Sequence, residues 1–412
     1  FRYFNDEEQA QVFSIMVDDG QAVEFLVELD DTLIANLLEN ETPERIATVI
    51  QESSANDQSF ILSTLEDEQA QSVIELLKTE EQEEIEELMG YPEDSAGAMM
   101  TTNVFTLYQN TICRDALKSL QDQSEAEMVF YLYITDEDDR LVGVASLRAL
   151  ATTPADTILK DIMVKRVHTV RPETDQEEVA QIVAQYNYLA VPVLDEDDQL
   201  LGIVTVDDVV DVIREEATED FLQMAGAGKD REILLKSSWE NARARLPWLF
   251  ASWIGGIFAA SIIGTFEHML ESMIALAAFI PVIIGMGGNI GTQSSTIIVR
   301  GIATGRIEIG SELKVLLKEV RVGIILGALY GLLLGAFAKF RFIDADPMLG
   351  VVVGLSIGCS MLLAVAVGTF VPMFLRKVDI DPAVASGPFV TTSIDILGVL
   401  FYFVIAEYFL SI

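Results

Sequence analysis

Cysteine and histidine are scarce in this sequence, with two residues of each among 412. Cys113 and Cys359 lie far apart, and His168 and His268 are isolated, so no spacing predicts a zinc site or a disulfide framework. The sequence also lacks a nucleophile–histidine or metal-ligand constellation of the kind that enzymes use. We therefore expect that the protein is not an enzyme.

Basic residues are scarce in the first half of the chain. Residues 1–220 contain 12 Lys and Arg against 51 Asp and Glu, whereas residues 221–412 contain 14 of each, so the formal net charge of −39 comes from the first half. Such a field repels nucleic acid and attracts cations, and we expect no nucleic-acid partner. The alternative explanation is that the acidic surface only makes this half of the chain soluble. The chain begins at Phe1 rather than Met, so we expect its natural start to lie upstream.

The first 92 residues are expected to form an acidic, all-helical N-terminal domain. Apolar residues recur there at helical spacing, as in Val73, Ile74 and Leu77. The stretch EEQAQVF at 7–13 resembles DEQAQSV at 67–73. Stacked short helices would produce this pattern, and a plain helical bundle is an equally good explanation.

Residues 97–217 contain an internal duplication. DDRLVGVASLRAL at 138–150 aligns with DDQLLGIVTVDDV at 197–209, and MTTNVFTL at 100–107 aligns with MVKRVHTV at 163–170. Each copy is typical of a strand, helix, strand, acidic turn, strand and helix. The duplication resembles a tandem pair of α/β CBS domains, a regulatory module, which we assign to residues 93–160 and 161–217.

Five apolar stretches follow, at about 248–268, 273–299, 320–340, 348–375 and 383–410. Each is long enough to cross a bilayer as a helix. We expect a membrane domain of five spans at 246–412, joined to the CBS pair by a connecting helix at 218–245. Twelve of the 14 basic residues of this half lie on one side of the spans. The positive-inside rule then places the N-terminal half in the cytoplasm of a plasma-membrane protein and the C-terminus outside.

Asp395 is the most informative residue of the apolar half. It lies 12 residues beyond Ala383, about 18 Å into the predicted span. A carboxylate at that depth normally faces a partner or a water-filled path. Thr391 lies on the same helix face, while Gly387 and Pro388 are expected to loosen the helix and free carbonyls toward a cavity. A structural Asp bonded to a neighbouring helix is the alternative.

The second span carries PVIIGMGGNIGTQSS at 281–295. Its proline and glycines predict irregular backbone that lines protein or water rather than lipid. Asn289 and Gln293, four residues apart, add amide groups to one face. A small-residue packing face is the alternative for the glycines.

An acidic run, DDVVDVIREEATED at 207–220, enters the connecting helix. Like charges four residues apart on a helix repel one another, and a bound divalent cation would relieve that repulsion. A solvated acidic face is the ordinary explanation for such a run.

Four motifs in order resemble the MgtE magnesium transporters: YPEDSAGAMMT at 91–101, EEATED at 215–220, the 281–295 motif and TTSID at 391–395. The resemblance covers essentially the whole chain and implies a homodimer in the lipid bilayer with one pore on its twofold axis. Asp395 would hold a hydrated Mg²⁺ in a pore lined by Asn289, Gly387, Pro388 and Thr391. Cytosolic Mg²⁺ would close the pore by binding sensor carboxylates: Asp94, Glu177, Asp208, Asp211, Glu216, Glu219 and Asp220.

Whether the CBS pair binds ATP stays open at this point. CBS nucleotide sites often use a Ser or Thr with an Asp three residues later, and Thr205 with Asp208 fits this pattern. In the first copy, Ser146 is followed by Ala149 instead. Arg148 is the candidate contact for a phosphate group.

The function expected from these features is a Mg²⁺-selective channel that mediates magnesium uptake. The alternative is an ion-coupled carrier of divalent cations such as Mg²⁺, Co²⁺ or Mn²⁺. The lack of a second mid-span carboxylate, which could relay protons, argues against a carrier. An anion channel would need basic residues in its path, and the spans offer none away from their ends.

Overall fold

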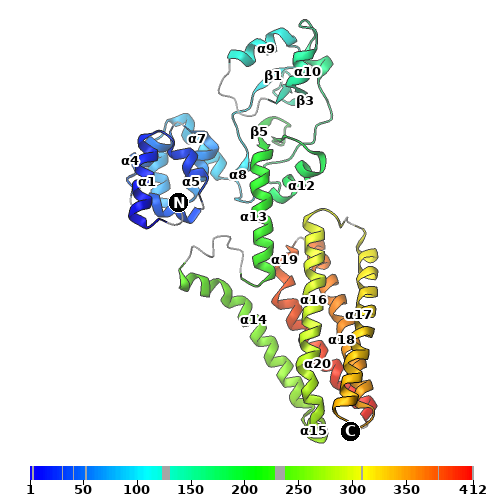
Figure 1. The fold of residues 1–412 in the computed structure, drawn as a ribbon. Coiled ribbons are helices and arrows are strands. Elements are labelled where there is room, and N and C mark those ends of the chain that lie inside the picture. Colours follow the sequence, from blue (N-terminus) through cyan, green and yellow to red (C-terminus); the bar gives the residue numbers. More distant parts are fainter. Residues whose placement is uncertain are drawn as a thin grey trace. The chain divides into compact units, whose positions relative to one another are not determined.

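The computed structural model describes the chain apart from residues 2–3, 30, 40, 52, 123–129, 228–236, 308–309, 379 and 411–412 (Figure 1). The chain divides into two compact units, Phe1–Glu215 and Glu216–Ile412, and each is described by itself. The expected fold class is confirmed: a helical N-terminal domain, an α/β CBS pair and a bundle of long apolar helices.

Short helices make up the described part of the N-terminal domain. Side-chain caps start several of them, because the first backbone N–H groups of a helix have no partner within it. Asn5 and Glu8 form a capping box, and the side chains of Thr42 and Ser54 cap later helices. Apolar side chains from most of these helices meet in one core. The helices are α1 (Asp6–Asp18), α2 (Ala22–Val27), α3 (Asp31–Leu38), α4 (Pro43–Ile50), α5 (Ala55–Ser63), α6 (Asp67–Ile74) and α7 (Thr79–Met89).

The CBS pair follows, and its two copies have related but unequal sheets. In the first copy β1 pairs in parallel with β2, which pairs antiparallel with β3. In the second copy β4 and β5 form the antiparallel pair. The strand expected at 163–170 is reduced to two isolated bridges, one between Val164 and Val144 and one between Val170 and Val193. The elements are α8 (Ala96–Met99), β1 (Thr106–Tyr108), α9 (Cys113–Asp122), β2 (Tyr131–Thr135), β3 (Leu141–Ser146), α10 (Leu147–Thr152), α11 (Leu159–Ile162), α12 (Gln176–Tyr186), β4 (Ala190–Leu194) and β5 (Leu200–Thr205).

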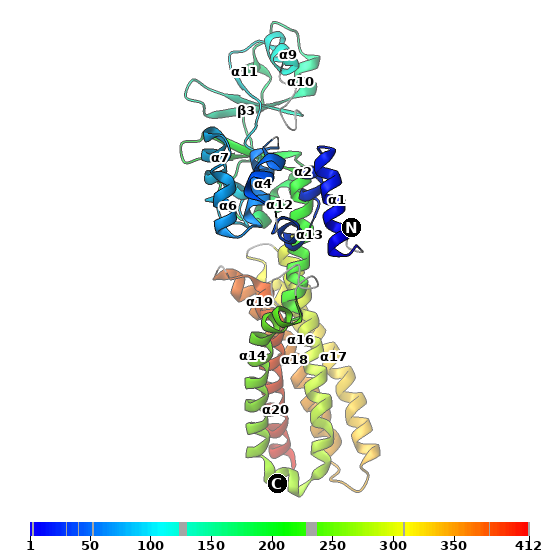
Figure 2. The same cartoon turned by 90° about the vertical axis from the view of Figure 1, so that its left-hand side faces the viewer.

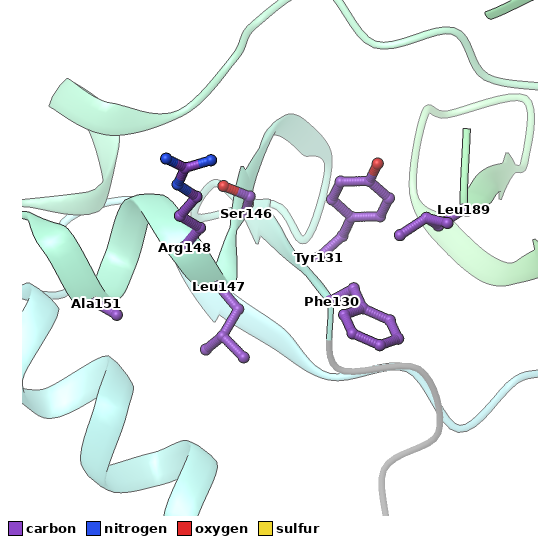
Figure 3. Close-up of a pocket in the computed structure, with 7 residues that line it drawn as sticks. All are labelled: Phe130, Tyr131, Ser146, Leu147, Arg148, Ala151 and Leu189. Atoms are coloured by element: carbon purple, nitrogen blue, oxygen red, sulfur yellow. The ribbon is translucent and has the colours of Figure 1, made fainter. Parts of the chain in front are cut away.

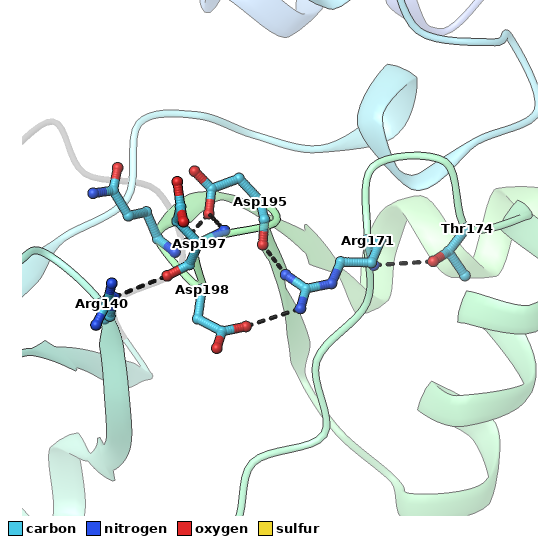
Figure 4. A network of polar contacts seen from close by, with 7 residues as sticks. Arg140, Arg171, Thr174, Asp195, Asp197 and Asp198 are labelled. Atoms are coloured by element: carbon cyan, nitrogen blue, oxygen red, sulfur yellow. Dashed lines mark hydrogen bonds and ion pairs between the residues drawn. The ribbon is translucent and has the colours of Figure 1, made fainter.

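The two copies exchange contacts through their acidic turns, as a duplicated module should. Arg140 Nε of the first turn donates to the Asp197 carbonyl at 3.0 Å, and Gln199 Nε2 of the second donates to the Asp138 carbonyl at 3.1 Å. Within the second copy, Arg171 forms an ion pair with Asp198 of the acidic turn at 2.8 Å (Figure 4). These reciprocal contacts confirm the duplication seen in the sequence.

The connecting helix predicted at 218–245 is not one helix. The last helix of the CBS pair, α13 (Val206–Met224), runs on past the predicted boundary and ends near Gly226, which has a positive φ of 71°. A separate helix, α14 (Ser238–Thr265), begins with a capping box between Ser237 and Glu240. The part of the prediction at 228–236 lies outside the described residues.

Five helices in the described part of the chain are long and apolar enough to cross a membrane. The five predicted spans are thus confirmed, and the structure adds a short helix, α15 (Glu267–Ser272), and a 3₁₀ helix, η1 (Ile274–Phe279), ahead of the second. Figure 2 shows the long helices running alongside one another within the second unit. They are α14, α16 (Ile280–Ala303), α17 (Glu312–Arg341), α18 (Leu349–Lys377) and α20 (Pro388–Leu410), with the short α19 (Pro382–Ser386) before the last.

Glycines let α17 and α18 pack backbone against backbone. A Cβ atom added to Gly331 would lie 2.7 Å from the Gly354 carbonyl oxygen, and one on Gly335 would lie 2.6 Å from that of Gly350. Small residues at four-residue spacing are a usual device for close packing of membrane helices. By contrast, α14 packs principally on α20 and is little buried within the single chain.

Candidate functional site

Asp395 lies half-buried on α20, and its neighbours on that helix set its direction. Ile394 lies against Gly291 of α16, and Thr392 lies against Gly255 of α14. Successive residues of a helix are about 100° apart, so the Asp395 position lies between these two directions. The carboxylate therefore belongs to the side of α20 that faces between α14 and α16.

A break precedes this helix and changes the predicted depth of the carboxylate. Gly387, at φ −88° and ψ −108°, leaves the helical region, so the last span begins at Pro388 rather than Ala383. Asp395 then lies about 10 Å into the span, not 18 Å. The carbonyl oxygens of Gly387 and Pro388 at the break lie 3.2 Å and 3.1 Å from Thr391 Oγ1, which shares its single hydrogen between them.

The glycine-rich motif of the second span forms a regular helix, α16, so the expected irregular backbone is not found. Its two faces differ. Gly287 and Gly291 are buried against α18 and α20, which agrees with the packing alternative. Asn289 and Gln293 are exposed, and Gly285 on the same side has open space around it. A membrane-spanning helix thus presents an amide-bearing face that the described residues of one chain leave exposed.

The end of α13 lies directly on the break before α20. A Cβ atom on Gly387 would lie 2.5 Å from the Met224 carbonyl oxygen, and one on Gly226 would lie 2.9 Å from Pro388 Cγ. Gln223, in the same turn, is fully buried. The helix that carries the acidic run therefore contacts the residues from which the Asp395 helix starts.

Asp220 on this helix has an altered acidity. Burial, assisted by the negative charges of Asp381 and Glu216, raises its pKa to about 6, although Arg300 acts in the opposite direction. Sequence reasoning selected Asp220 and Glu216 but missed Asp381. The signal was available, since Asp381 lies in the loop between the last two spans, on the side where the basic residues gather.

The Asp208 side chain is hydrogen-bonded to Thr205, the residue just before the first turn of α13. It accepts hydrogen bonds from Thr205 Oγ1 at 2.6 Å and Thr205 N at 3.2 Å. Burial raises its pKa, and the charges of Asp207 and of Asp57 in the N-terminal domain act in the same direction. Asp57 was not selected from the sequence, because nothing in its local pattern links it to residue 208.

Two other predicted sensor residues lie close together. Gln176 donates its backbone N–H to the Asp94 carbonyl at 3.0 Å and its side-chain amide to Asp94 Oδ1 at 3.3 Å, which brings the adjacent Glu177 near Asp94. Asp211 instead forms an exposed ion pair with Arg214 at 3.2 Å.

Glu219 accepts a hydrogen bond from Gln223 Nε2 at 2.6 Å. In the described part of the chain, no three His, Cys, Asp or Glu side chains are grouped closely enough to hold a metal ion. The predicted sensor carboxylates therefore do not form a complete set of metal ligands within the described part of one chain.

The first CBS copy has an open pocket of about 500 Å³ (Figure 3). Arg148 lies on α10 at one side of it, and the aromatic residues Phe130 and Tyr131 lie at the other. Ser146 accepts a hydrogen bond from the Ala149 N–H, so its hydroxyl caps α10. The pocket is lined by Phe130, Tyr131, Ser146, Leu147, Arg148, Ala151 and Leu189.

Comparison with known proteins gives a consistent result along the chain. The family model of MgtE, described as a divalent cation transporter, matches residues 280–405, that of the MgtE intracellular N domain matches 1–94, and CBS domains match 96–155 and 159–215. The magnesium transporter MgtE of Enterococcus faecalis is 40% identical over 326 residues, 79% of this chain and 71% of that protein. Its counterpart in Thermus thermophilus is 39% identical over 329 residues, 79% of this chain and 72% of that protein. A crystal structure of the cytosolic domain of the Mg²⁺ channel MgtE with ATP is 35% identical, covers 51% of this chain and 86% of that one, and has a TM-score of 0.49.

Proposed function

Because the chain belongs to the MgtE family and is a magnesium transporter, we propose that it works as a homodimeric Mg²⁺-selective channel for uptake, with Asp395 in its pore. Cytosolic Mg²⁺ bound to the acidic residues closes the pore. The N-terminal half lies in the cytoplasm and, after five spans, the C-terminus lies outside. The family's activity is transport, so no catalytic residue is assigned.

The observation that carries the pore proposal is the half-buried Asp395, on the side of α20 between α14 and α16. Mg²⁺ gives up its water shell reluctantly, and a carboxylate can hold the hydrated ion through hydrogen bonds to the coordinated waters. The exposed amides of Asn289 and Gln293 offer further partners for these waters. Selectivity then follows from the size of the hydrated ion.

The gating proposal rests on the contact between α13 and the break at Gly387. A hydrated Mg²⁺ near Asp220, Glu216 and Asp381 would offset their mutual repulsion and hold α13 on the start of α20. The ion would act through its coordinated waters, because no three carboxylates of the described residues are grouped closely enough to ligate it directly. Without Mg²⁺, repulsion between these carboxylates would favour release of α13. Asp94, Glu177, Asp208, Asp211 and Glu219 would complete the sensor in the cytosolic domains.

Purified protein in liposomes tests the pore proposal. Asp395→Asn keeps the shape of the side chain and removes its charge, so we expect Mg²⁺ flux to fall at least about tenfold, equivalent to roughly 1.4 kcal/mol. Glu407→Gln on the exposed side of the same helix is the matched control and should transport normally. Mg²⁺ flux at the wild-type rate in Asp395→Asn would refute the assignment.

We also propose that the pocket beside Arg148 binds ATP, with the guanidinium on a phosphate and an aromatic ring of Phe130 or Tyr131 against the base. Ala149 stands where CBS sites often carry a ribose-binding Asp, so affinity should be modest. Calorimetry with ATP should give binding that Arg148→Ala weakens. Equal affinity in the two proteins, or no binding by the wild type, would exclude the proposal.

An ion-coupled carrier remains the second candidate, because the third span contains a buried carboxylate after all. The sequence placed the start of this span near residue 320, but α17 begins at Glu312, and Glu319 is only 8% exposed. Currents from single molecules in planar bilayers would support a channel. Mg²⁺ movement only in exchange for, or together with, another ion would support a carrier.

A further inference from the structure

Glu319 lies on the most closely packed face of α17. It precedes Gly323, Gly327, Gly331 and Gly335 at the same four-residue spacing, and all of them are buried. The basic residues of the same helix segment, Lys314, Lys318 and Arg321, are exposed. The carboxylate therefore points into the helix bundle while its charged neighbours point away.

One hydroxyl group contacts this carboxylate, and another follows it in the sequence. Ser294 of α16 donates a hydrogen bond to Glu319 Oε2 at 3.1 Å, and Ser294 is 3% exposed. The hydroxyl of the next residue, Ser295, is fully buried and has no hydrogen-bond partner among the described residues. Ser295 lies one turn beyond Gly291, whose carbonyl lies against Gly368 of α18.

The helix register brings a third hydroxyl to the same level. A Cβ atom on Gly323 would lie 3.2 Å from Val365. The helices α17 and α18 are antiparallel, so one turn before Gly323 on α17 is level with one turn after Val365 on α18. These two positions are Glu319 and Thr369. The Thr369 hydroxyl is also fully buried and without a partner among the described residues. Unpaired hydroxyls in a packed interior are costly, and these two lie at about the level of the Glu319 carboxylate on the helices that pack around it, as a bound ligand would require.

We propose that Glu319 and the hydroxyls around it hold one Na⁺ between α16, α17 and α18 of each protomer, apart from the Mg²⁺ path. None of the ion pairs between described residues involves Glu319, and a buried carboxylate requires a compensating positive charge. One carboxylate with neutral hydroxyl oxygens matches a monovalent cation in charge. Mg²⁺ fits poorly, because it retains several waters and a buried packing face leaves little room for them.

Sodium binding is measured on the full-length protein in detergent, at pH 7.5 with EDTA, in NaCl or choline chloride of equal ionic strength. We expect radioactive Na⁺ to bind at one ion per chain, and the melting temperature to rise saturably with Na⁺ by a few degrees, about 3 °C. Glu319→Gln should lose both effects. Glu312→Gln, an exposed carboxylate on the same helix, is the matched control and should retain both.

Thr369→Val retains the carboxylate and side-chain shape, so it tests the site if Glu319→Gln folds poorly. It should raise the Na⁺ concentration for half-saturation at least threefold. The proposal is overturned if wild-type protein binds no Na⁺ and melts equally in NaCl and choline chloride. Melting that responds to pH between 6 and 8 but not to Na⁺ would also overturn it, since Na⁺ would then contribute nothing to stability.

Discussion

Asp220 is placed where a change of pH near neutrality alters its charge. Its pKa is raised from 3.8 to about 6, so its ionised form is disfavoured in the folded protein. This penalty is full above pH 6, declines as the pH falls below 6 and is gone near pH 3.8. A bound Mg²⁺ would offset the penalty at pH 7.5. Below pH 6 a proton occupies the carboxylate instead, and Mg²⁺ must displace it.

We therefore predict that closure of the pore requires a higher Mg²⁺ concentration at acidic pH. For one group with a pKa of about 6, the Mg²⁺ concentration at half-closure should rise about fourfold between pH 7.5 and pH 5.5. Asp220→Asn should remove most of this rise, whereas Asp207→Asn, at an exposed carboxylate in the first turn of the same helix, should keep it. Flux in liposomes at both pH values measures the effect. A rise of the same size in Asp220→Asn would show that another group titrates.

At the scale of elements, the α17–α18 contact depends on the absence of side chains. Gly331→Ala would place a Cβ atom 2.7 Å from the Gly354 carbonyl oxygen, and backbone cannot move aside as a side chain can. We predict destabilisation by about 1–3 kcal/mol, seen as a lower melting temperature in detergent. Gly256→Ala on α14 meets nothing within 4 Å and should be neutral or slightly stabilising. Equal melting of the two variants would contradict this packing.

The contact between α13 and the break before α20 gives a second prediction at this scale. Gly387→Ala would bring a Cβ atom within 2.5 Å of the Met224 carbonyl oxygen and should displace the end of α13. We expect Mg²⁺ flux to persist at Mg²⁺ concentrations that close the wild type, since the closed contact is weakened. Gly264→Ala, which has open space around it, serves as the control. If the Mg²⁺ dependence of flux in Gly387→Ala equals that of the wild type, the contact between α13 and Gly387 does not control gating.

The elements show why sequence patterns predicted some features and not others. Hydrophobic length predicted the five spans, and the duplicated acidic turns predicted the CBS pair, because both depend on local composition. The end of α13 at Met224 and the start of α20 at Pro388 depend on tertiary contacts. Asp57 and Asp381 were missed because their carboxylate neighbours are distant in sequence, and Glu319 was missed because its burial follows from the packing of α16 and α18 around it.

At the scale of the whole molecule, charge dominates the first half of the chain. The residues responsible for the net charge of −39 repel one another in the absence of divalent cations. We predict that millimolar Mg²⁺ makes residues 1–220 more resistant to protease, and that EDTA reverses this. Replacing Asp208, Asp211, Glu216, Glu219 and Asp220 together by Asn or Gln should abolish the difference. Identical digestion of the wild type with and without Mg²⁺ would contradict a sensor held by metal.

The last prediction concerns the number of chains in the working molecule. A single chain leaves Asn289 and Gln293 exposed on a membrane helix, and lipid cannot satisfy their amides. A second copy about a twofold axis, the commonest symmetry of oligomers, would enclose this face and bring two Asp395 carboxylates to one path.

We predict a dimeric mass in detergent. In a background with Cys113 and Cys359 replaced by Ala, Gln293→Cys should form a disulfide-linked dimer on oxidation. Leu332→Cys, on a side chain of α17 that is 75% exposed, is the control and should remain monomeric in the same gel, because that side of the helix would face lipid. A monomer that still conducts Mg²⁺ would show instead that one chain encloses the whole path.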